Sequence, residues 1–215
     1  MSNFGVEHLR LANPYTTAFR EARSAVGASS VLKNAQDFRS VADAVADCAL
    51  VVGTTAVRNR ALQNPLRRLN PESASAVRTA MISGRVALLF GSEKIGLTNE
   101  DFTYCHWLLH IPTHEQHISM NLGQAVAVCL FGLSSAVADE KHRTHDDPAL
   151  SGEIEKITQM LYESLKISGY VKPGNDVVSE RKVRRLLLRL NLQAMDAKVL
   201  MGMVRQIVWK LRQTK

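Results

Sequence analysis

Three short apolar runs constrain the fold of this chain more than any other feature of its sequence. They are CALVVG at residues 48–53, RVALLFG at 85–91 and HWLLHIP at 106–112, and each stops at glycine or proline. A run without polar alternation fits a strand that is buried on both faces, as in a parallel sheet. Segments with helical periodicity separate the runs. The first part of the chain therefore predicts an α/β fold with a mostly parallel sheet.

The segments around these runs complete the expectation. Apolar residues at helical spacing predict helices over 15–26, 37–47, 73–83 and 119–137. Brief strands are expected at 6–12 and 31–32. Residues 58–71 are polar, basic and interrupted by two prolines, which predicts a long loop.

After Pro148 the strand signals end. A helix is predicted over 154–165, and one stripe of apolar residues from Val183 to Leu211 predicts a single long last helix with a basic opposite face. The charged stretch DEKHRTHDDP precedes this part. We therefore expect an α/β domain over residues 1–140 and a small all-α extension over residues 149–215.

The charge balance favours an acidic partner. The chain carries 27 Lys and Arg against 20 Asp and Glu, a net charge of +7. This excess is typical of nucleic-acid binding, although a solvated basic surface would give the same count. Basic residues gather in the predicted loop, where we expect contacts with an RNA backbone from Arg58, Arg60, Arg67 and Arg68.

Composition excludes several classes of protein. No apolar stretch reaches the roughly 18 residues of a membrane helix, and the N-terminus lacks the order of a signal peptide, so a cytoplasmic protein is expected. The three cysteines are predicted to be small buried apolar residues without a disulfide framework. Four histidines between His106 and His117 have the spacing of a metal face, but Pro112 interrupts any helix there, and no metal site is expected.

Polar residues and glycines follow each of the three apolar runs. Gly53 to Thr55 follow the first, Gly91 to Gly96 the second, and residues 111–121 the third. In open α/β sheets, ligands bind outside the carboxyl ends of the strands. Each signal alone fits a turn, a helix cap or a solvated carboxylate equally well; Ser119, for example, is a plausible N-cap.

In order and spacing, these segments resemble a known family. FGSEKIGL at 90–97 and IPTHEQHISMNLGQAVA at 111–127 are similar to the second and third motifs of SpoU/TrmH-type RNA ribose 2′-O-methyltransferases of the SPOUT superfamily. GTTAVRNR at 53–60 and the ending VRRLLLRLNLQAMDAKVLMGMVRQI at 183–207 resemble its TrmJ-like branch. The resemblance covers nearly the whole chain.

The resemblance implies a fold, an activity and an assembly. The fold is a deep trefoil knot near the C-terminal end of the α/β domain, and the assembly is a homodimer. The activity is transfer of a methyl group from S-adenosyl-L-methionine to a ribose 2′-hydroxyl of tRNA or rRNA. For this branch it points to tRNA, at a nucleotide of the anticodon loop.

The resemblance also implies which residues form the site. Glu93, Ser119 and Asn121 would organise its polar, catalytic end. Met120 stands where the family usually has leucine, a conservative apolar exchange. The residues implied in cofactor binding, largely through backbone groups, are Thr54, Thr55, Phe90, Gly91, Gly96, Ile111, Pro112, Ser119, Met120 and Leu122.

The sequence departs from the family at its first motif, an asparagine–glycine turn that opens a helix carrying an arginine. No later segment replaces it, since Arg10 is expected in a strand and Arg20 and Arg23 in a helix. Three accounts are open: the native start lies upstream of Met1, the chain is a truncated paralogue, or a partner subunit supplies the arginine. The main alternative function is therefore a non-catalytic dimer that binds S-adenosylmethionine or RNA. A helical protein-interaction module on a degenerate domain is the third possibility.

Overall fold

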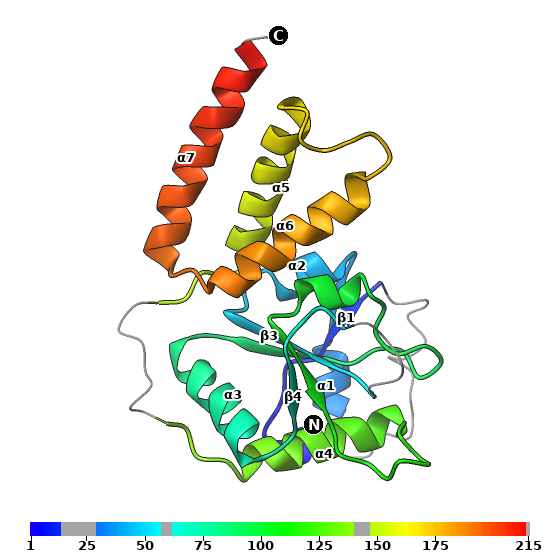
Figure 1. Ribbon diagram of the computed structural model, residues 1–215. Coiled ribbons are helices and arrows are strands. Elements are labelled where there is room, and N and C mark those ends of the chain that lie inside the picture. Colours follow the sequence, from blue (N-terminus) through cyan, green and yellow to red (C-terminus); the bar gives the residue numbers. More distant parts are fainter. Residues whose placement is uncertain (14–28, 57–61, 140–146, 214–215) are drawn as a thin grey trace.

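The predicted apolar runs form neighbouring strands of one parallel sheet. The computed structural model describes residues 1–13, 29–56, 62–139 and 147–213 (Figure 1). The four-stranded sheet has the order β4-β6-β3-β5, and its pairings are parallel. Its strands are β3 (Leu50–Thr54), β4 (Leu66–Arg68), β5 (Val86–Leu89) and β6 (Trp107–His110). The α/β prediction with a mostly parallel sheet is confirmed.

Both faces of this sheet are covered, because alternate residues of β3 and β6 point into two different cores. Val51 and Leu108 pack beside α2 (Val41–Val45) and the 3-10 helix η3 (Asp101–Tyr104). Val52 and Leu109 pack on the other face with residues of α3 (Pro71–Ser83) and α4 (Leu122–Ser134). The absence of polar alternation in the sequence runs is explained by this two-sided burial.

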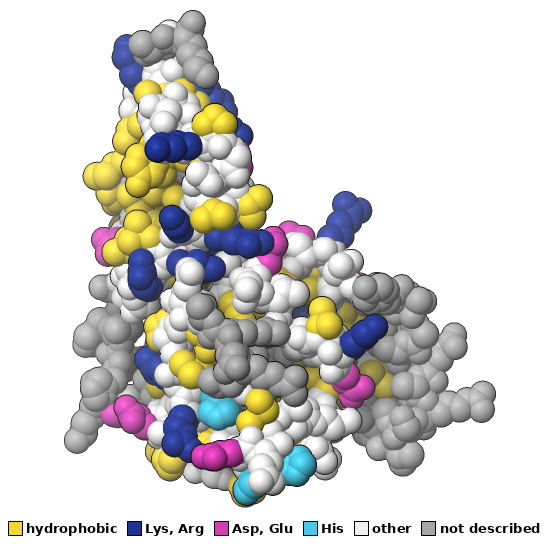
Figure 2. Space-filling view, turned by 45° about the vertical axis from the view of Figure 1, so that its right-hand side comes forward, with side chains coloured by type: hydrophobic (Ala, Val, Ile, Leu, Met, Phe, Trp, Pro, Cys, Tyr) yellow, Lys and Arg dark blue, Asp and Glu magenta, His cyan; other side chains and the backbone are white. Residues whose placement is uncertain are grey.

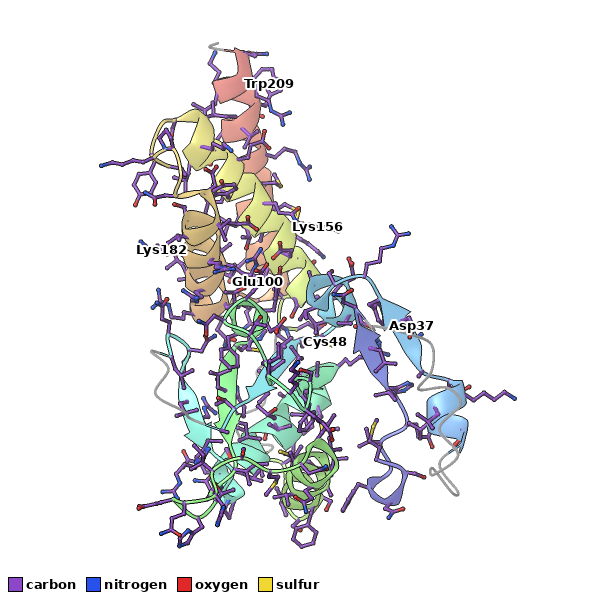
Figure 3. All side chains as sticks on the ribbon, turned by 90° about the vertical axis from the view of Figure 1, so that its right-hand side faces the viewer. Asp37, Cys48, Glu100, Lys156, Lys182 and Trp209 are labelled. Carbon is purple, nitrogen blue, oxygen red and sulfur yellow. The ribbon has the colours of Figure 1, made fainter. Side chains whose placement is uncertain are left out.

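A small second sheet lies to one side of the first (Figure 3). It pairs β1 (Arg10–Ala12) with β2 (Gln36–Phe38) in parallel. Between them, α1 (Ser29–Lys33) occupies the place where a strand at 31–32 was predicted, and that prediction is wrong. A two-residue apolar pair has no periodicity, so it could not distinguish a helix from a strand. The 3-10 helix η1 (Ser2–Phe4) precedes β1.

Several predicted boundaries were too wide. The helix expected over 37–47 is α2 alone, which begins after Ser40, whose side chain accepts a hydrogen bond from the Asp43 amide at 3.1 Å. The loop expected over 58–71 contains β4, an exposed edge strand of three residues, two of them arginine, which is too short and too polar to give an apolar signal. The helix expected over 15–26 lies outside the described residues.

The helix α3 illustrates how local sequence sets an element. Asn70 caps it by accepting a hydrogen bond from the Ser73 amide at 2.8 Å, and Pro71 occupies its first turn. Gly84 follows its last residue. Each feature is a recognised helix-boundary signal, and the helix predicted over 73–83 is confirmed.

The C-terminal part consists of three helices packed around their own core. They are α5 (Ser151–Ile167), α6 (Asp176–Leu190) and α7 (Ala194–Gln213). The prediction of one long helix from Val183 to Leu211 is wrong, because Asn191 adopts a left-handed conformation with φ 48° and ends α6. The apolar spacing continues across this break, which hid it. Since residues 140–146 are not described, the domain limits stay a prediction.

The extension joins the α/β part at the amino ends of the strands. The Ser151 amide and hydroxyl both donate to the carbonyl of Cys48, each at 2.9 Å, and Cys48 lies just before β3. The candidate site, at the carboxyl ends, is therefore at the opposite end of the sheet. All three cysteines are buried, as predicted. Among the described helices, none is long and apolar enough to cross a membrane.

An ion cluster ties the small sheet to the large one. Arg10 of β1 donates to both carboxylate oxygens of Asp47, at 2.5 and 2.8 Å, and to the Ala44 carbonyl at 2.8 Å. Arg85, just before β5, binds the same carboxylate. Hydrogen bonding to Arg10 holds the pKa of Asp47 well below its usual range, outweighing the opposing effect of burial.

Asp47→Asn is therefore expected to lower the free energy of unfolding at pH 7 by about 1 kcal/mol, since the pair is partly exposed. A lowered folded-state pKa means that the carboxylate stabilises fully above the unfolded value of about 3.9, and that this contribution is lost progressively as pH falls from there through the much lower folded-state pKa. Urea unfolding at pH 7 and pH 2 should show a smaller gap in stability between wild type and variant at pH 2. Glu115→Gln, an exposed carboxylate, is the control, and an equal gap at both pH values would contradict the assignment.

Candidate functional site

The carboxyl ends of β3, β5 and β6 meet at one edge of the sheet. Gly53 pairs in register with Leu89 on one side and Leu108 on the other. The Thr54 hydroxyl donates to the Leu89 carbonyl at 2.9 Å, and the Thr55 amide donates to the Leu109 carbonyl at 3.0 Å. The first of the predicted loops is thus held between the other two.

The loop after β5, residues 90–97, folds tightly on itself. The Gly96 amide donates to the Ser92 carbonyl at 2.8 Å, and Gly96 adopts a left-handed conformation with φ 70°. A Cβ atom at Gly91 would lie 1.9 Å from the Gly96 carbonyl carbon and 2.0 Å from the Leu97 nitrogen. Only glycine permits this approach of backbone to backbone.

The end of this loop is anchored beneath the first. Leu97 is buried in the core beside Cys105 and Leu108. A Cβ atom at Gly53 would meet the Cys105 sulfur at 2.7 Å and the Leu97 side chain at 3.4 Å. Gly53 therefore lets the end of β3, the loop after β5 and the start of β6 pack closely.

A hydrogen bond joins the second and third loops. The Asn121 side chain donates to Glu93 Oε1 at 3.2 Å, across 28 residues of sequence. Its carbonyl oxygen accepts from the Gly123 amide at 2.8 Å, so Asn121 is the N-cap of α4. The interpretation of Ser119 as the N-cap is therefore wrong; the more favourable capping geometry belongs to the asparagine two residues later.

Most of the predicted site residues lie within this arrangement. Phe90 and Ile111 pack, partly buried, on the core beneath the edge. Exposed Pro112 and Ser119 and half-buried Met120 follow in the third loop, and half-buried Leu122 opens α4. The edge thus offers apolar surface beside the polar groups of Thr54, Glu93 and Asn121, which suits a ligand with one flat apolar part and one polar part. The individual roles of these residues stay predictions.

Two of the four predicted RNA contacts lie beside the same edge. Arg67 and Arg68 are exposed on β4, and Arg68 pairs in register with His110 at the end of β6. The Arg67 guanidinium lies 4.6 Å from the centre of the Trp107 ring, a cation–π contact. Arg58 and Arg60 lie outside the described residues. Figure 2 shows Lys and Arg side chains on one face of the molecule, from the extension down over the α/β part.

The histidines do not form a ligand set. His106 accepts a hydrogen bond from the Val51 amide at 3.1 Å, and burial lowers its pKa to about 4. His114 and His117 lie beyond the strand, with ring centres 6.4 Å apart. Within the described ranges, no three His, Cys, Asp or Glu side chains are grouped so that they could hold a metal ion.

One positioning residue was missed from the sequence. Asn64 donates through its side-chain nitrogen to the carbonyls of Phe102 and Cys105, at 3.0 and 2.8 Å. It thereby connects the segment before β4 to η3. No sequence signal could have singled it out, because it stands in a stretch that read as an irregular loop.

Comparison with known proteins gives a consistent result. Residues 1–131 match the SpoU rRNA Methylase family. The tRNA (cytidine/uridine-2'-O-)-methyltransferase TrmJ of Citrobacter koseri is 32% identical over 96% of this chain and 87% of its own length. An uncharacterized tRNA/rRNA methyltransferase of Haemophilus influenzae is 32% identical over 100% of this chain and 89% of its own length. The crystal structure of TrmJ from Z. mobilis covers 96% of this chain and 89% of its own, at 30% identity and a TM-score of 0.83.

The loop geometry predicts opposite behaviour for two neighbouring glycines. Gly91→Ala is expected to lower the free energy of unfolding by about 2 kcal/mol or more, because its Cβ would strike backbone that cannot yield. Gly96→Asn is the matched control: nothing lies near its Cβ position, and asparagine tolerates the left-handed conformation. Urea unfolding of both variants checks this, and equal stability of the two would show that the loop is not closed as described.

Proposed function

The chain belongs to the SpoU rRNA Methylase family, and from this membership we propose that it methylates the ribose 2′-hydroxyl of a cytidine or uridine in tRNA, with S-adenosyl-L-methionine as methyl donor. The observation that carries the proposal is the hydrogen bond between Asn121 and Glu93, because it joins the two motifs of the resemblance at the carboxyl edge of the sheet.

The residues at the edge fit such a donor. Phe90, Ile111 and Leu122 offer partly buried apolar surface for its adenosine part. The loop closed at Gly91 and Gly96 presents backbone groups, and the Glu93 carboxylate supplies negative charge for the cationic part. Bound there, the donor would supply a methyl group already activated by its sulfonium charge.

The protein's own part in this reaction is alignment and placement of charge. Asn121 holds the Glu93 carboxylate and caps α4, so the polar end of the site has a defined geometry. Together with Ser119, these side chains would orient the ribose hydroxyl. Alignment of reacting groups alone can lower a barrier by several kcal/mol.

One observation supports a second candidate function. Arg10 is held on Asp47 at the amino ends of the strands, so it is not placed to act on a ribose hydroxyl at the carboxyl edge. A dimer that binds S-adenosylmethionine or RNA without methylating it is therefore the alternative. Calorimetry with the donor and with tRNA, and transfer of a labelled methyl group to tRNA, separate the two: binding of donor or tRNA without transfer selects the alternative, and binding of neither rejects both.

The proposal extends to assembly and chain path. A homodimer is supported by exposed apolar side chains on α4, where Phe131 is 64% and Val128 37% exposed. Sedimentation as a monomer at micromolar concentration would reject it.

The deep trefoil knot of the family is proposed for residues of β6 and α4. It is supported by the position of β6 inside the sheet, although β6 is the last of the four strands in sequence. Because its proposed substrate is tRNA, the protein is placed in the cytoplasm.

Asn121 provides the sharpest test of the site. Asn121→Asp keeps an oxygen that caps α4 but cannot donate to Glu93, whereas Asn121→Ala loses both contacts. Both variants are expected to reduce methyl transfer by on the order of a hundredfold, while only Asn121→Ala loses about 1 kcal/mol of stability. Transfer rates and urea unfolding measure the two effects. Full activity in Asn121→Asp would remove this contact from the mechanism.

The basic edge predicts a change in salt dependence. Arg68→Ala should reduce the slope of log affinity for tRNA against log salt concentration by about one, as expected for one lost phosphate contact. The control is Arg212→Ala, at the far end of α7, where the arginine is paired with Glu163. Filter binding over a range of salt concentrations measures the slopes. An unchanged slope for Arg68→Ala would place the RNA elsewhere.

A further inference from the structure

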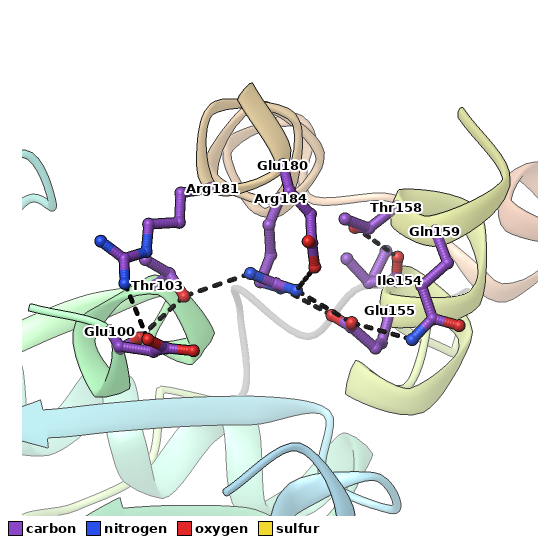
Figure 4. A network of polar contacts seen from close by, with 9 residues as sticks. All are labelled: Glu100, Thr103, Ile154, Glu155, Thr158, Gln159, Glu180, Arg181 and Arg184. Carbon is purple, nitrogen blue, oxygen red and sulfur yellow. Dashed lines mark hydrogen bonds and ion pairs between the residues drawn. The ribbon is translucent and has the colours of Figure 1, made fainter. Parts of the chain in front are cut away.

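A buried arginine of the extension reaches across into the α/β part. Arg184 lies on α6, and the residue is 4% exposed. Its Nε and Nη2 donate to the two carboxylate oxygens of Glu155 on α5, at 2.6 and 2.9 Å, and Nη2 also donates to Glu180 at 2.6 Å. Figure 4 shows the guanidinium between these carboxylates and η3.

The other side of the same guanidinium contacts η3. Its Nη1 donates to the hydroxyl of Thr103 at 3.4 Å, and its central carbon lies 4.6 Å from the centre of the Tyr104 ring. Thr103 is fully buried and donates in turn to the Glu100 carbonyl at 2.7 Å. Burial lowers the pKa of Arg184, but the carboxylates outweigh this and raise it overall, so the cation is permanent.

Neighbouring arginines of α6 repeat this pattern. Arg181 donates to Glu100, at the start of η3, at 2.7 Å, and Figure 3 shows Glu100 just below α6. Arg185 binds Gln63, which precedes β4. Asn64, the next residue, is bonded to the carbonyls of Phe102 and Cys105. The segment before β4 and η3 are thus held to each other and to α6.

Each of these two segments follows one of the loops of the candidate site in the chain. The segment at Gln63 leads the chain back from the first loop, which leaves β3 at Thr54. In the same way, η3 leads back from the loop over 90–97, since the Phe102 amide donates to the Thr98 carbonyl at 3.1 Å and Leu97 packs beneath Gly53. The extension therefore contacts the segments that follow both loops, at the amino ends of the strands, about 15 Å from the carboxyl edge.

We propose that Arg184 is a positioning residue for the methyl-donor site, through which the helical extension fixes η3 and, with it, the buried end of the loop over 90–97. The inference rests on the proposed function, because it concerns the same site. Arg184 contacts η3 at the amino ends of the strands, away from the proposed donor site, and acts through Thr103, Tyr104 and Leu97. A small displacement of this loop is enough to weaken binding at a site that depends on the alignment of its groups.

Paired substitutions separate this role from simple folding. Arg184→Met removes the charge and every polar contact. Tyr104→Leu leaves the ion pairs of the extension intact and removes only the stacked ring, while Tyr104→Phe keeps the ring and is its rescue control. Arg212→Met, which breaks the exposed ion pair with Glu163 on the same extension, is the control for loss of an arginine.

Calorimetry with S-adenosylmethionine, with amide hydrogen exchange of residues 97–104 as a second readout, tests the proposal on the full chain. Arg184→Met and Tyr104→Leu should weaken donor affinity on the order of tenfold and speed exchange in 97–104, whereas Tyr104→Phe and Arg212→Met should match wild type. If Arg184→Met does not fold, Tyr104→Leu decides alone. Wild-type affinity and exchange in a folded Tyr104→Leu would overturn the proposal. Failure of the wild type itself to bind the donor would instead reject the proposed function, and this inference with it.

Discussion

The parallel alignment of β3 between β5 and β6 is the constraint on which the candidate site depends. Parallel strands that are neighbours in register release their chains at the same edge, so the loops after Thr54, Leu89 and His110 have to meet there. Two glycines make that meeting close. Gly53 admits the side chains of Cys105 and Leu97, and Gly91 admits the backbone of the loop's own far end.

The two ends of the sheet have different chemistry. At the amino ends, charged groups are paired and tied to structure: Asp47 with two arginines, and Arg184 with two glutamates. The Arg184 cluster is the buried one of the two, and removing one partner of a buried pair typically costs about 3–5 kcal/mol, because the other charge stays buried and uncompensated. At the carboxyl ends, Glu93, Asn121 and Arg68 are exposed, which leaves them accessible to a ligand. Stabilising ion pairs and the proposed chemistry are thereby separated by the length of a strand.

The helical extension is attached at the amino ends of the strands, where these ion pairs lie. Its own core is apolar, and its contacts with the α/β part include hydrogen bonds from three arginines of α6. Arginine suits this place because its planar guanidinium can bind two carboxylates and stack on a ring at once. The contacts give the extension a defined orientation on the amino ends of the strands.

Local sequence determined the elements whose signals are carried by the residues themselves. The three apolar runs predicted β3, β5 and β6 because strands buried on both faces need apolar residues throughout, and Asn70, Pro71 and Gly84 marked the ends of α3. Tertiary structure alone decided the rest. The edge strand β4 has no apolar pattern, since its backbone pairs with β6 while its side chains stay exposed. Asn191 breaks the last helix without interrupting the apolar spacing. The contacts of Asn121 with Glu93 and of Arg184 with η3 join residues far apart in sequence. Local periodicity reports which side of an element is buried, but not which distant side chain lies against it, and for that reason the candidate residues could be predicted from sequence while their arrangement required the fold.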